Sequence, residues 1–405
     1  MAYVFYIFAA LLIIQGLFSL IEGIQFRAFV SQSLQEPVGA FTPKASIIAP
    51  CKGVDPELEE NLDALFMQEY PSYEIVFAIA SSEDAARPVI ERAITNHPQV
   101  ASRLIIATGS DTRSEKVSNL LSALASVNTQ SEALVFVDSD ARACKGWLRA
   151  LVAPLSDSRV GAVTGYRWYL PARGGFWSAL LSAWNGSVAT TLGGHGRNFA
   201  WGGATAILRE TFERAGVPDR WQAAVSDDYA LTRAMQDAGL RIRFVPRCLM
   251  QSREDVCLGK LMEFTTRQVI ITRVYRPRMW CVGLISNLLF AAVFFGGMVF
   301  ISGRMLRGES VTSMLVMLAM IYSLGSIKGA LRLLAAREAL PSARDEITRS
   351  WRMFCLLWPL VSLVFLYNFI KSATTRRIHW RGVCYEMRSP TETIVRAGSE
   401  RARAQ

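Results

Sequence analysis

Histidine is scarce in this chain of 405 residues, and its cysteines lack the spacing of a metal site or a disulfide framework. With only His97, His195 and His379, a histidine-based triad or a multi-histidine metal site is not expected. The seven cysteines are odd in number, scattered and without a CxxC pair. Reduced thiols in a cytosol-facing domain are therefore expected.

The net charge of +10 comes without the signals of a nucleic-acid-binding protein. The chain has no lysine-rich tail, no zinc-ligand spacing and no aromatic RNA-binding motif, so nucleic acid is not expected as a partner. The basic residues instead gather beside apolar stretches, at Arg267, Arg273, Arg276, Arg278, Lys371, Arg376, Arg377 and Arg381. Cations in these places favour an anionic membrane surface.

Long apolar runs lie at the N-terminus and after residue 280. Residues 3–24 are long enough to span a bilayer, and we expect a retained anchor with its N-terminus outside. A cleaved signal peptide is the alternative, but it would need a charged leading segment and a cleavage site. Residues 281–301 and 311–326 are two further spans, whereas 354–370 is shorter and contains a proline. Four crossings would place the arginine-rich tail outside, so 354–370 is the candidate for a re-entrant or interfacial segment.

Between the apolar runs, short apolar strands alternate with helices. Strands are expected at 45–49, 73–80, 104–108 and 133–137, with helices between them at 57–68, 85–95 and 114–127. Such alternation indicates βαβ units and a mostly parallel sheet, with ligands at the carboxyl ends of the strands. The predicted organisation is an anchor (1–26), an α/β catalytic domain with interfacial helices (44–278), C-terminal membrane helices (279–372) and a basic cytoplasmic tail (373–405).

An acidic pair follows the last of these strands. Asp138 and Asp140 stand one residue apart at the tip of the apolar run 134–137. Such a pair can hold a hard divalent cation, Mg²⁺ or Mn²⁺, and leave positions for diphosphate oxygens. Asp-Ser-Asp is also good turn chemistry, so a solvated turn is the alternative.

A second acidic pair, Asp227 and Asp228, follows Ser226 at the start of a predicted helix. Acids at a helix start are commonly caps, stabilised by free N–H groups and the helix dipole. One cap does not need two acids, however, and displacement at a sugar carbon needs a carboxylate to accept the hydroxyl proton. Asp228 is the candidate base, with Asp227 oriented beside it.

A third candidate segment, 263–276, lies just before a predicted span. Arg267 and Gln268 are positioned to bind a diphosphate or to line an acceptor pocket from an interfacial helix. Arg273 and Arg276 in the same segment are better explained as side chains that extend to the lipid headgroups.

These motifs together resemble ceramide glucosyltransferases, a branch of the inverting, metal-dependent family 2-type glycosyltransferases with the GT-A fold. The resemblance begins at Lys52-Gly-Val-Asp-Pro56 and ends near Trp380-Arg-Gly382 with Tyr385, so it spans nearly the whole chain. It implies a GT-A catalytic domain, a UDP-hexose donor, a lipid acceptor such as ceramide and a divalent cation. It leaves the oligomeric state open.

The resemblance also implies roles for single residues. The residues implied to bind the donor are Asp84 (with Glu83 as the alternative), Lys52, Lys116, Asp138, Arg267 and Gln268, and those implied to bind the metal are Asp138 and Asp140. The residues implied to bind the acceptor are Trp201, Gly202, Gly203 and His195. The implied catalytic residues are Asp228 and Asp227. A hydrogen bond within its own loop is the alternative for His195. The sequence departs from the family at Ile270 and Ile271, where animal members have Arg-Trp, and at Ala85, where proline is frequent.

Three other functions are alternatives to lipid glycosylation. A processive polysaccharide synthase of the cellulose or hyaluronan type keeps an intact Gln-x-x-Arg-Trp, whereas Gln268 is followed by Val-Ile-Ile. A transporter would need ionisable residues within interrupted membrane helices, and a scaffold with a dead transferase domain would have lost its acids. The predicted function is transfer of one hexose to a lipid hydroxyl.

Overall fold

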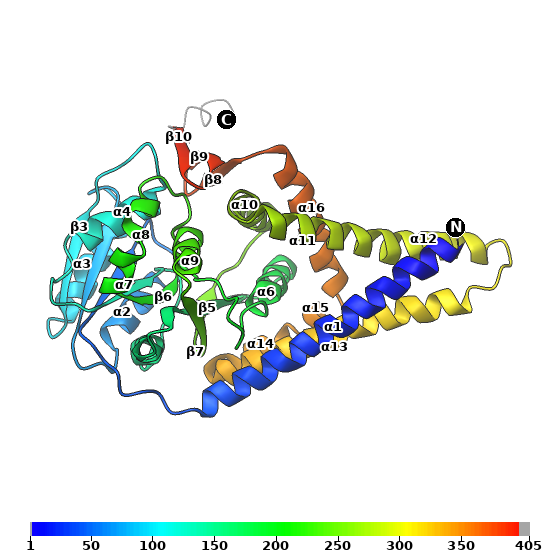
Figure 1. Cartoon of the computed structure of the whole chain (residues 1–405), viewed down its shortest axis with the longest axis horizontal. Coiled ribbons are helices and arrows are strands. Elements are labelled where there is room, and N and C mark those ends of the chain that lie inside the picture. Colours follow the sequence, from blue (N-terminus) through cyan, green and yellow to red (C-terminus); the bar gives the residue numbers. More distant parts are fainter. Residues whose placement is uncertain (1, 397–405) are drawn as a thin grey trace. The chain divides into compact units, whose positions relative to one another are not determined.

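The computed structural model describes residues 2–396, which divide into two compact units. The first unit comprises the N-terminal helix, residues 173–190 and residues 255–375. The second comprises residues 32–172 and 191–254 together with the C-terminal segment from residue 376. Figure 1 traces the elements of both units. Residues 397–405 of the predicted tail lie outside the described residues.

The second unit is built on a seven-stranded sheet with the order β3-β2-β1-β4-β6-β5-β7. Its strands are β1 Ala45–Pro50, β2 Tyr73–Ile79, β3 Ala101–Ile106, β4 Ala133–Val137, β5 Val160–Leu170, β6 Ala204–Leu208 and β7 Arg241–Arg253. Pairs β1–β2, β2–β3, β1–β4 and β5–β7 are parallel, whereas β6 runs antiparallel to β4 and β5. Strands β1 and β4 lie on either side of the point where strand order reverses, which is where ligands bind in such sheets.

Helices cover both faces of this sheet. They are α2 Leu58–Phe66, α3 Arg87–Asn96, α4 Glu115–Leu124, α5 Trp147–Val152, the 3-10 helix η1 Ala153–Ser156, α7 Arg209–Arg214, α8 Val217–Trp221 and α9 Asp227–Asp237. Ile48, Phe136 and Trp221 belong to one core that joins the sheet to α4 and to α7–α9. Phe66 of α2 packs on Phe77 of β2, 5.9 Å between ring centroids, and belongs to the opposite face.

The sequence expectations cover the first four strands of this sheet and agree with the elements observed there, whereas β5, β6 and β7 were not predicted. Strand 133–137 is reproduced as β4, and the helix expected at 114–127 is α4. The third strand begins three residues earlier than expected, because Ala101 already pairs with Glu74 of β2. The fold class, a mostly parallel α/β sheet accompanied by apolar helices, is confirmed.

The chain ends in a smaller sheet that the sequence analysis did not foresee. Antiparallel strands β8 Arg377–Trp380, β9 Val383–Ser389 and β10 Glu392–Arg396 form it. The Tyr385 hydroxyl accepts a hydrogen bond from the N–H of Glu115 at 3.2 Å. The Thr393 hydroxyl donates to the carbonyl of Ala223 at 2.9 Å. This part of the expected tail is therefore docked on the catalytic unit.

The first unit is helical and apolar. Its helices are α1 Ala2–Gln35, α6 Phe176–Ala189, α10 Leu258–Tyr275, α11 Pro277–Ala291, the π-helical turn η2 Ala292–Gly296, α12 Gly297–Met305, α13 Thr312–Ala339, η3 Pro341–Ala343, α14 Arg344–Arg349, α15 Trp351–Cys355 and α16 Trp358–Thr374. Phe5 of α1 packs with Phe294 and Leu318, yet Val282 and Val299 are exposed. Exposed apolar side chains on helices are expected where lipid is the solvent.

Three helical stretches among the described residues are long and apolar enough to cross a membrane: Ala2–Gln35, Pro277–Met305 and Thr312–Ala339. The segment 354–370 is not one of them. It is divided between α15 and α16, and the second of these begins at Trp358 with Pro359 in its first turn. Proline fits the first turn of a helix but breaks its interior, which explains the division.

Candidate active site

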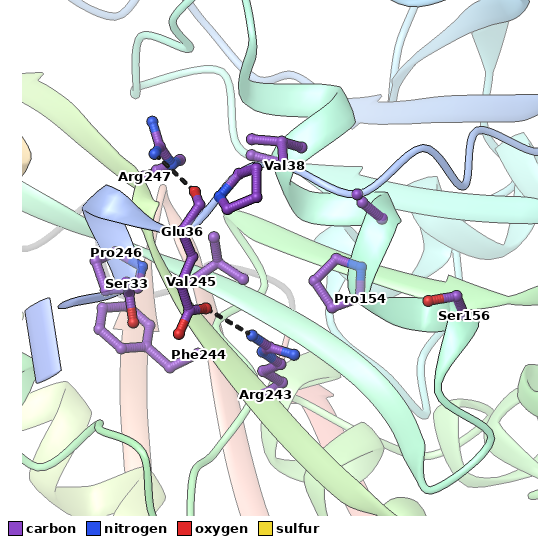
Figure 2. Close-up of a pocket in the computed structure, with 14 residues that line it drawn as sticks. Ser33, Glu36, Val38, Pro154, Ser156, Arg243, Phe244, Val245, Pro246 and Arg247 are labelled. Carbon is purple, nitrogen blue, oxygen red and sulfur yellow. Dashed lines mark hydrogen bonds and ion pairs between the residues drawn. The ribbon is translucent and has the colours of Figure 1, made fainter.

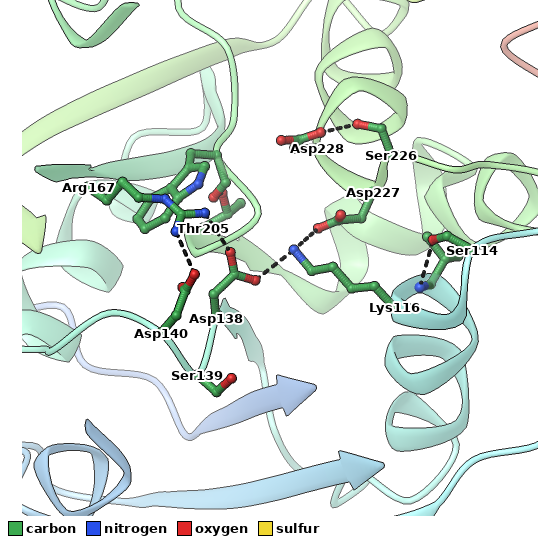
Figure 3. Close-up of polar contacts among 12 residues, drawn as sticks. Ser114, Lys116, Asp138, Ser139, Asp140, Arg167, Thr205, Ser226, Asp227 and Asp228 are labelled. Carbon is green, nitrogen blue, oxygen red and sulfur yellow. Dashed lines mark hydrogen bonds and ion pairs between the residues drawn. The ribbon is translucent and has the colours of Figure 1, made fainter. Parts of the chain in front are cut away.

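One buried ammonium joins acids from two distant loops. Asp138 follows β4, and Asp227 begins α9, where the chain enters a helix after a loop. Lys116, in the first turn of α4, places its Nζ 2.7 Å from Asp138 Oδ1 and 3.2 Å from Asp227 Oδ2 (Figure 3). Burial disfavours the charge of Lys116, but the two carboxylates raise its pKa above the ordinary value. The acids predicted from separate motifs therefore share one centre.

A second buried cation, Arg167 of β5, completes the charge balance (Figure 3). Its guanidinium is 2.7 Å from Asp140 Oδ2 and 3.5 Å from Asp138 Oδ2. The same group lies over the ring of Trp201, 5.0 Å from the centroid. Sequence reasoning missed Arg167. The signal available was a lone arginine within an otherwise buried strand, a position that charged residues occupy only when paired.

Burial acts in the same direction on the two acids that contact Lys116, but their net pKa shifts are opposite. Burial raises the pKa of Asp138, but Lys116 and Arg167 overcome this and leave it below the ordinary value. Burial raises the pKa of Asp227 to about 6, against the opposing effect of Lys116 and with Asp228 adding to the rise. Asp227 has the more distant contact with Lys116, so its carboxylate is the less stabilised of the two.

Asp228 occupies the next position of α9 and is half-buried. Ser226 donates a hydrogen bond to its Oδ1, and the N–H of Tyr229 donates to the same oxygen at 2.7 Å. The described part of the chain donates no hydrogen bond to Oδ2. Ser226 itself is the N-cap, since its hydroxyl accepts from the Tyr229 N–H at 3.3 Å. Capping is thus carried out by the serine, which leaves one oxygen of Asp228 available for other chemistry.

The metal-binding prediction can be tested against the oxygens that remain open. Among the described residues no group of three or more histidines, cysteines and acids is arranged as a metal cage. Both oxygens of Asp138 face cations, but Asp140 Oδ1 is buried and has no hydrogen-bonding partner among the described residues. A hard cation bound mainly by phosphate oxygens needs only one or two protein carboxylates. The residues present fit a cation held between Asp140 and a diphosphate.

The predicted donor residues of β1 and β2 also meet. Asp84 accepts hydrogen bonds from the N–H groups of Gly53 at 2.7 Å and Ala86 at 2.9 Å, which links the loops after β1 and β2. Glu83, the alternative to Asp84, is exposed; the Ser82 hydroxyl donates to its carboxylate at 3.5 Å, and its N–H donates to the Ser81 hydroxyl at 3.2 Å. The loop after β1 is joined to α4 as well, since Lys52 Nζ lies 2.8 Å from Glu115.

The residues predicted to bind the acceptor make contacts within the catalytic unit, and their part in acceptor binding stays a prediction. A Cβ on Gly202 would lie 2.2 Å from Asp227 Oδ2 and 2.8 Å from Lys116 Nζ, so only glycine leaves room for this ion pair. A Cβ on Gly203 would lie 2.2 Å from the ring of Trp201. His195 is exposed, and its Nδ1 accepts from the N–H of Arg197 at 3.3 Å, the loop contact given as its alternative.

Arg267 and Gln268 belong to the helical unit. The Arg267 guanidinium lies 5.3 Å from the ring centroid of Phe264, and the carbonyl of Gln268 accepts from the Thr272 hydroxyl at 2.8 Å. Both residues lie on α10, in agreement with the helix expected there. Their part in binding stays a prediction.

A cavity of about 250 Å³ lies where the linker after α1 meets β7 (Figure 2). Arg243 is 3.6 Å from the Glu36 carboxylate, and Arg247 donates to the Glu36 carbonyl at 3.0 Å. None of the predicted site residues lines this cavity. Its polar contacts fasten the linker to the sheet.

Acids from separate loops at the strand ends of a mostly parallel sheet, in a chain with membrane-length helices, define a membrane glycosyltransferase of the GT-A type. The chain belongs to Glycosyl transferase family 21, whose family model matches residues 4–393.

Relatives of known activity match the chain at low identity. Ceramide glucosyltransferase 3 of Caenorhabditis elegans is 23% identical over 358 residues, which are 85% of this chain and 73% of the relative. Ceramide glucosyltransferase 1 of the same organism is 22% identical over 271 residues, 63% of this chain and 57% of the relative. The ceramide glucosyltransferase of Komagataella phaffii is 30% identical over 104 residues, 26% of this chain and 19% of the relative.

Solved structures are more distant. A mannosyltransferase from Pyrobaculum calidifontis, determined in complex with GDP-Man and Mn²⁺, is 17% identical, with 91% of this chain and 99% of that chain covered and a TM-score of 0.49. Glucosyl-3-phosphoglycerate synthase from Mycobacterium tuberculosis covers 57% of this chain and 80% of its own, at 16% identity and a TM-score of 0.37. Similarities at this level say nothing further about the site of this chain.

Proposed function

We propose that the protein transfers a hexose, with UDP-glucose as the first candidate donor, to the hydroxyl of a membrane lipid such as ceramide. Membership of Glycosyl transferase family 21 and the named ceramide glucosyltransferase relatives support this proposal. The observation that carries it is the centre in which Lys116 joins Asp138 to Asp227, directly before Asp228. Transfer to a lipid also gives a reason for the membrane-length helices, because they confine enzyme and acceptor to one surface.

The reaction is an inverting displacement in which Asp228 is the base. Its carboxylate accepts the proton of the lipid hydroxyl as the oxygen forms its bond to the anomeric carbon. The bond from that carbon to the diphosphate oxygen breaks, and the nucleoside diphosphate leaves with the electron pair. Lys116 and Arg167 hold Asp138 and Asp140 in place for the diphosphate. A divalent cation held by Asp140 would neutralise charge on the leaving diphosphate.

The first experiment identifies donor and acceptor. The purified full chain, in vesicles, is incubated with UDP-glucose, UDP-galactose or GDP-mannose, with Mg²⁺ or Mn²⁺, and with ceramide or diacylglycerol. Mass spectrometry of the lipid fraction should show one added hexose with one donor. A polymeric product would favour the polysaccharide synthase, and no product with any pair would contradict the proposed function.

Asp228→Asn tests the base. Loss of a positioned general base lowers the transfer rate by about 10²–10⁴-fold, while donor binding persists because the amide keeps the shape of the side chain. Asp237→Asn is the matched control, since Asp237 ends the same helix, is exposed and pairs with Arg233. Near-normal turnover in Asp228→Asn would remove the assignment.

We also infer the membrane topology from the docking of the C-terminal sheet. Tyr385 and Thr393 bond to the catalytic unit, so the chain before α11 and the chain after α16 lie on one side of the membrane. The number of crossings between them is therefore even. Residues 277–305 and 312–339 supply two, and α16, with 17 residues, adds none. With α1 the chain crosses three times, and the positive-inside bias puts the catalytic unit in the cytoplasm.

A further inference from the structure

The turn between β8 and β9 carries an arginine in an unusual backbone conformation. Trp380 pairs with Val383, so Arg381 and Gly382 form a two-residue hairpin turn. Their φ angles are 47° and 86°. Hairpin turns with positive φ at both positions favour asparagine and glycine, and a larger residue there is uncommon. A residue in such a conformation is held there by the surrounding structure, and here the contacts of the arginine side chain are part of it.

The Arg381 side chain contacts the loop that follows β1. Its Nη2 lies 2.9 Å from both carboxylate oxygens of Asp55, and its Nη1 donates to the carbonyl of Lys52. Contact with both oxygens of a carboxylate fixes orientation as well as distance. Asp55 is largely withdrawn from water, since its side chain is 19% exposed. The turn of the C-terminal sheet is thus anchored on the loop containing Lys52 and Asp55.

This contact extends to the acidic pair after β4. The Ser139 hydroxyl donates to Asp55 Oδ2 at 3.1 Å, and Ser139 stands between Asp138 and Asp140. Asn61 of α2 donates to the Ser139 carbonyl at 3.1 Å from the other side. Arg381 is therefore two contacts away from the carboxylates proposed to receive the diphosphate. Removing the Arg381 side chain would leave the partly buried Asp55 carboxylate without its cation. The loss would directly affect Ser139, because its hydroxyl donates to this carboxylate.

We propose that Arg381 is a positioning residue of the donor site. The turn of the C-terminal hairpin fastens the loop 52–55 and, through Asp55 and Ser139, holds Asp138 and Asp140 in the geometry that receives the diphosphate. The inference rests on the proposed function for the identity of the donor. A purely structural role would predict that any contact docking the C-terminal sheet matters equally, and the test separates the two.

Two variants and two controls make the comparison in the full chain. Arg381→Gln removes the charge, and Arg381→Lys keeps it but loses the second nitrogen that bonds to the Lys52 carbonyl. Tyr385→Phe removes another hydrogen bond that docks the same sheet, away from Asp55. Arg388→Gln alters an exposed arginine of β9 that pairs with Glu392. Steady-state kinetics with donor and lipid varied separately, together with UDP affinity by calorimetry, are the measurements.

We expect Arg381→Gln to raise the donor KM and weaken UDP binding by about tenfold or more, as expected for a displaced binding group, with the lipid KM unchanged. Arg381→Lys should fall between it and the wild type, and both controls should keep the wild-type donor KM. Asp55→Asn should reproduce the effect of Arg381→Gln, and combining the two should add little.

Wild-type donor KM in Arg381→Gln, or an equal change in Tyr385→Phe, would overturn the inference. The failure of the proposed function looks different: the wild-type chain would transfer no sugar to any lipid tested. UDP affinity would still be measured in that case. An unchanged UDP affinity in Arg381→Gln would reject Arg381 as a positioning residue regardless of the acceptor.

Discussion

Lys116 and Arg167 supply the positive charges that compensate the repulsion between the acids of this site. Asp138, Asp140 and Asp227 come from two loops, and without buried cations their mutual repulsion would keep them apart or protonated. Each carboxylate instead contacts an ammonium or a guanidinium. The compensation of charge is unequal. Asp138 contacts both cations, whereas Asp227 contacts Lys116 alone of the two, and at the longer distance.

The weaker stabilisation of the Asp227 carboxylate predicts the pH dependence of the reaction. The pKa of Asp227 is raised to about 6 by burial, so the carboxyl becomes protonated as the pH falls through this value. A neutral Asp227 no longer holds Lys116, and the transfer rate should fall on the acid side of pH 6. Initial rates measured at saturating substrates on both sides of this pH test it.

Asp227→Asn provides the control for this pH dependence. Its residual activity should be lower at neutral pH and should lack the acid limb, because the amide does not titrate. An acid limb of unchanged position in the variant would assign the titration to another group.

At the scale of elements, glycines determine how closely the helices of the helical unit pack against one another. A Cβ on Gly329 of α13 would lie 2.0 Å from the carbonyl oxygen of Phe354 in α15. A Cβ on Gly325 would lie 2.3 Å from the ring of Trp358, at the start of α16. Small residues at such contacts are how helices pack closely in a membrane, where no hydrophobic effect drives them together.

Gly329→Ala should therefore destabilise the helical unit. The clash is with backbone, which cannot rotate away, and overpacking of this kind costs about 1–3 kcal/mol. The measurement is thermal unfolding in detergent, in which Tm should fall. Gly303→Ala in α12 is the matched control: no atom lies within 4 Å of its Cβ, so the alanine should raise stability slightly. Equal Tm values for the two variants would contradict this account of the α13–α15 contact.

At the scale of the whole molecule, the C-terminal sheet constrains the path of the chain through the membrane. Arg304 in the last turn of α12 and Arg307 in the connection to α13 both pair with Glu309. The proposed topology places this connection outside, opposite the more numerous basic residues that flank α10, α13 and α16. In the same proposed topology, strands β8 to β10 lie on the other side, with the catalytic unit on which they dock.

Two epitope insertions test this topology. An epitope after Gly308 should be reached by an impermeant antibody on intact cells, whereas an epitope at the C-terminus should be reached only after permeabilisation. Retained transferase activity is the control for correct folding. Access to both epitopes on intact cells would mean that α16 crosses the membrane as well.

The sequence alone determined β1 to β4, the helices between them and the motif residues, because these depend on local order. Apolar runs ending in Asp-Ser-Asp or beginning after Ser-Asp-Asp indicate a strand end and a helix start wherever they occur. The fold class and the membrane-length helices followed from these patterns, and the family followed from the resemblance of the motifs. The sequence pattern also predicts a cap at the start of α9, and Ser226 is that cap.

Only the tertiary structure decided which charges meet. Lys116 contacts acids that follow it by 22 and 111 positions in the numbering, and no local pattern contains that pairing. Arg167 lies in a strand without a motif, and Arg381 reaches Asp55 from 326 positions away. Ion pairs between distant segments depend on sheet order and on how loops converge at strand ends. The chain specifies both through packing of the whole core, which a single sequence pattern does not display.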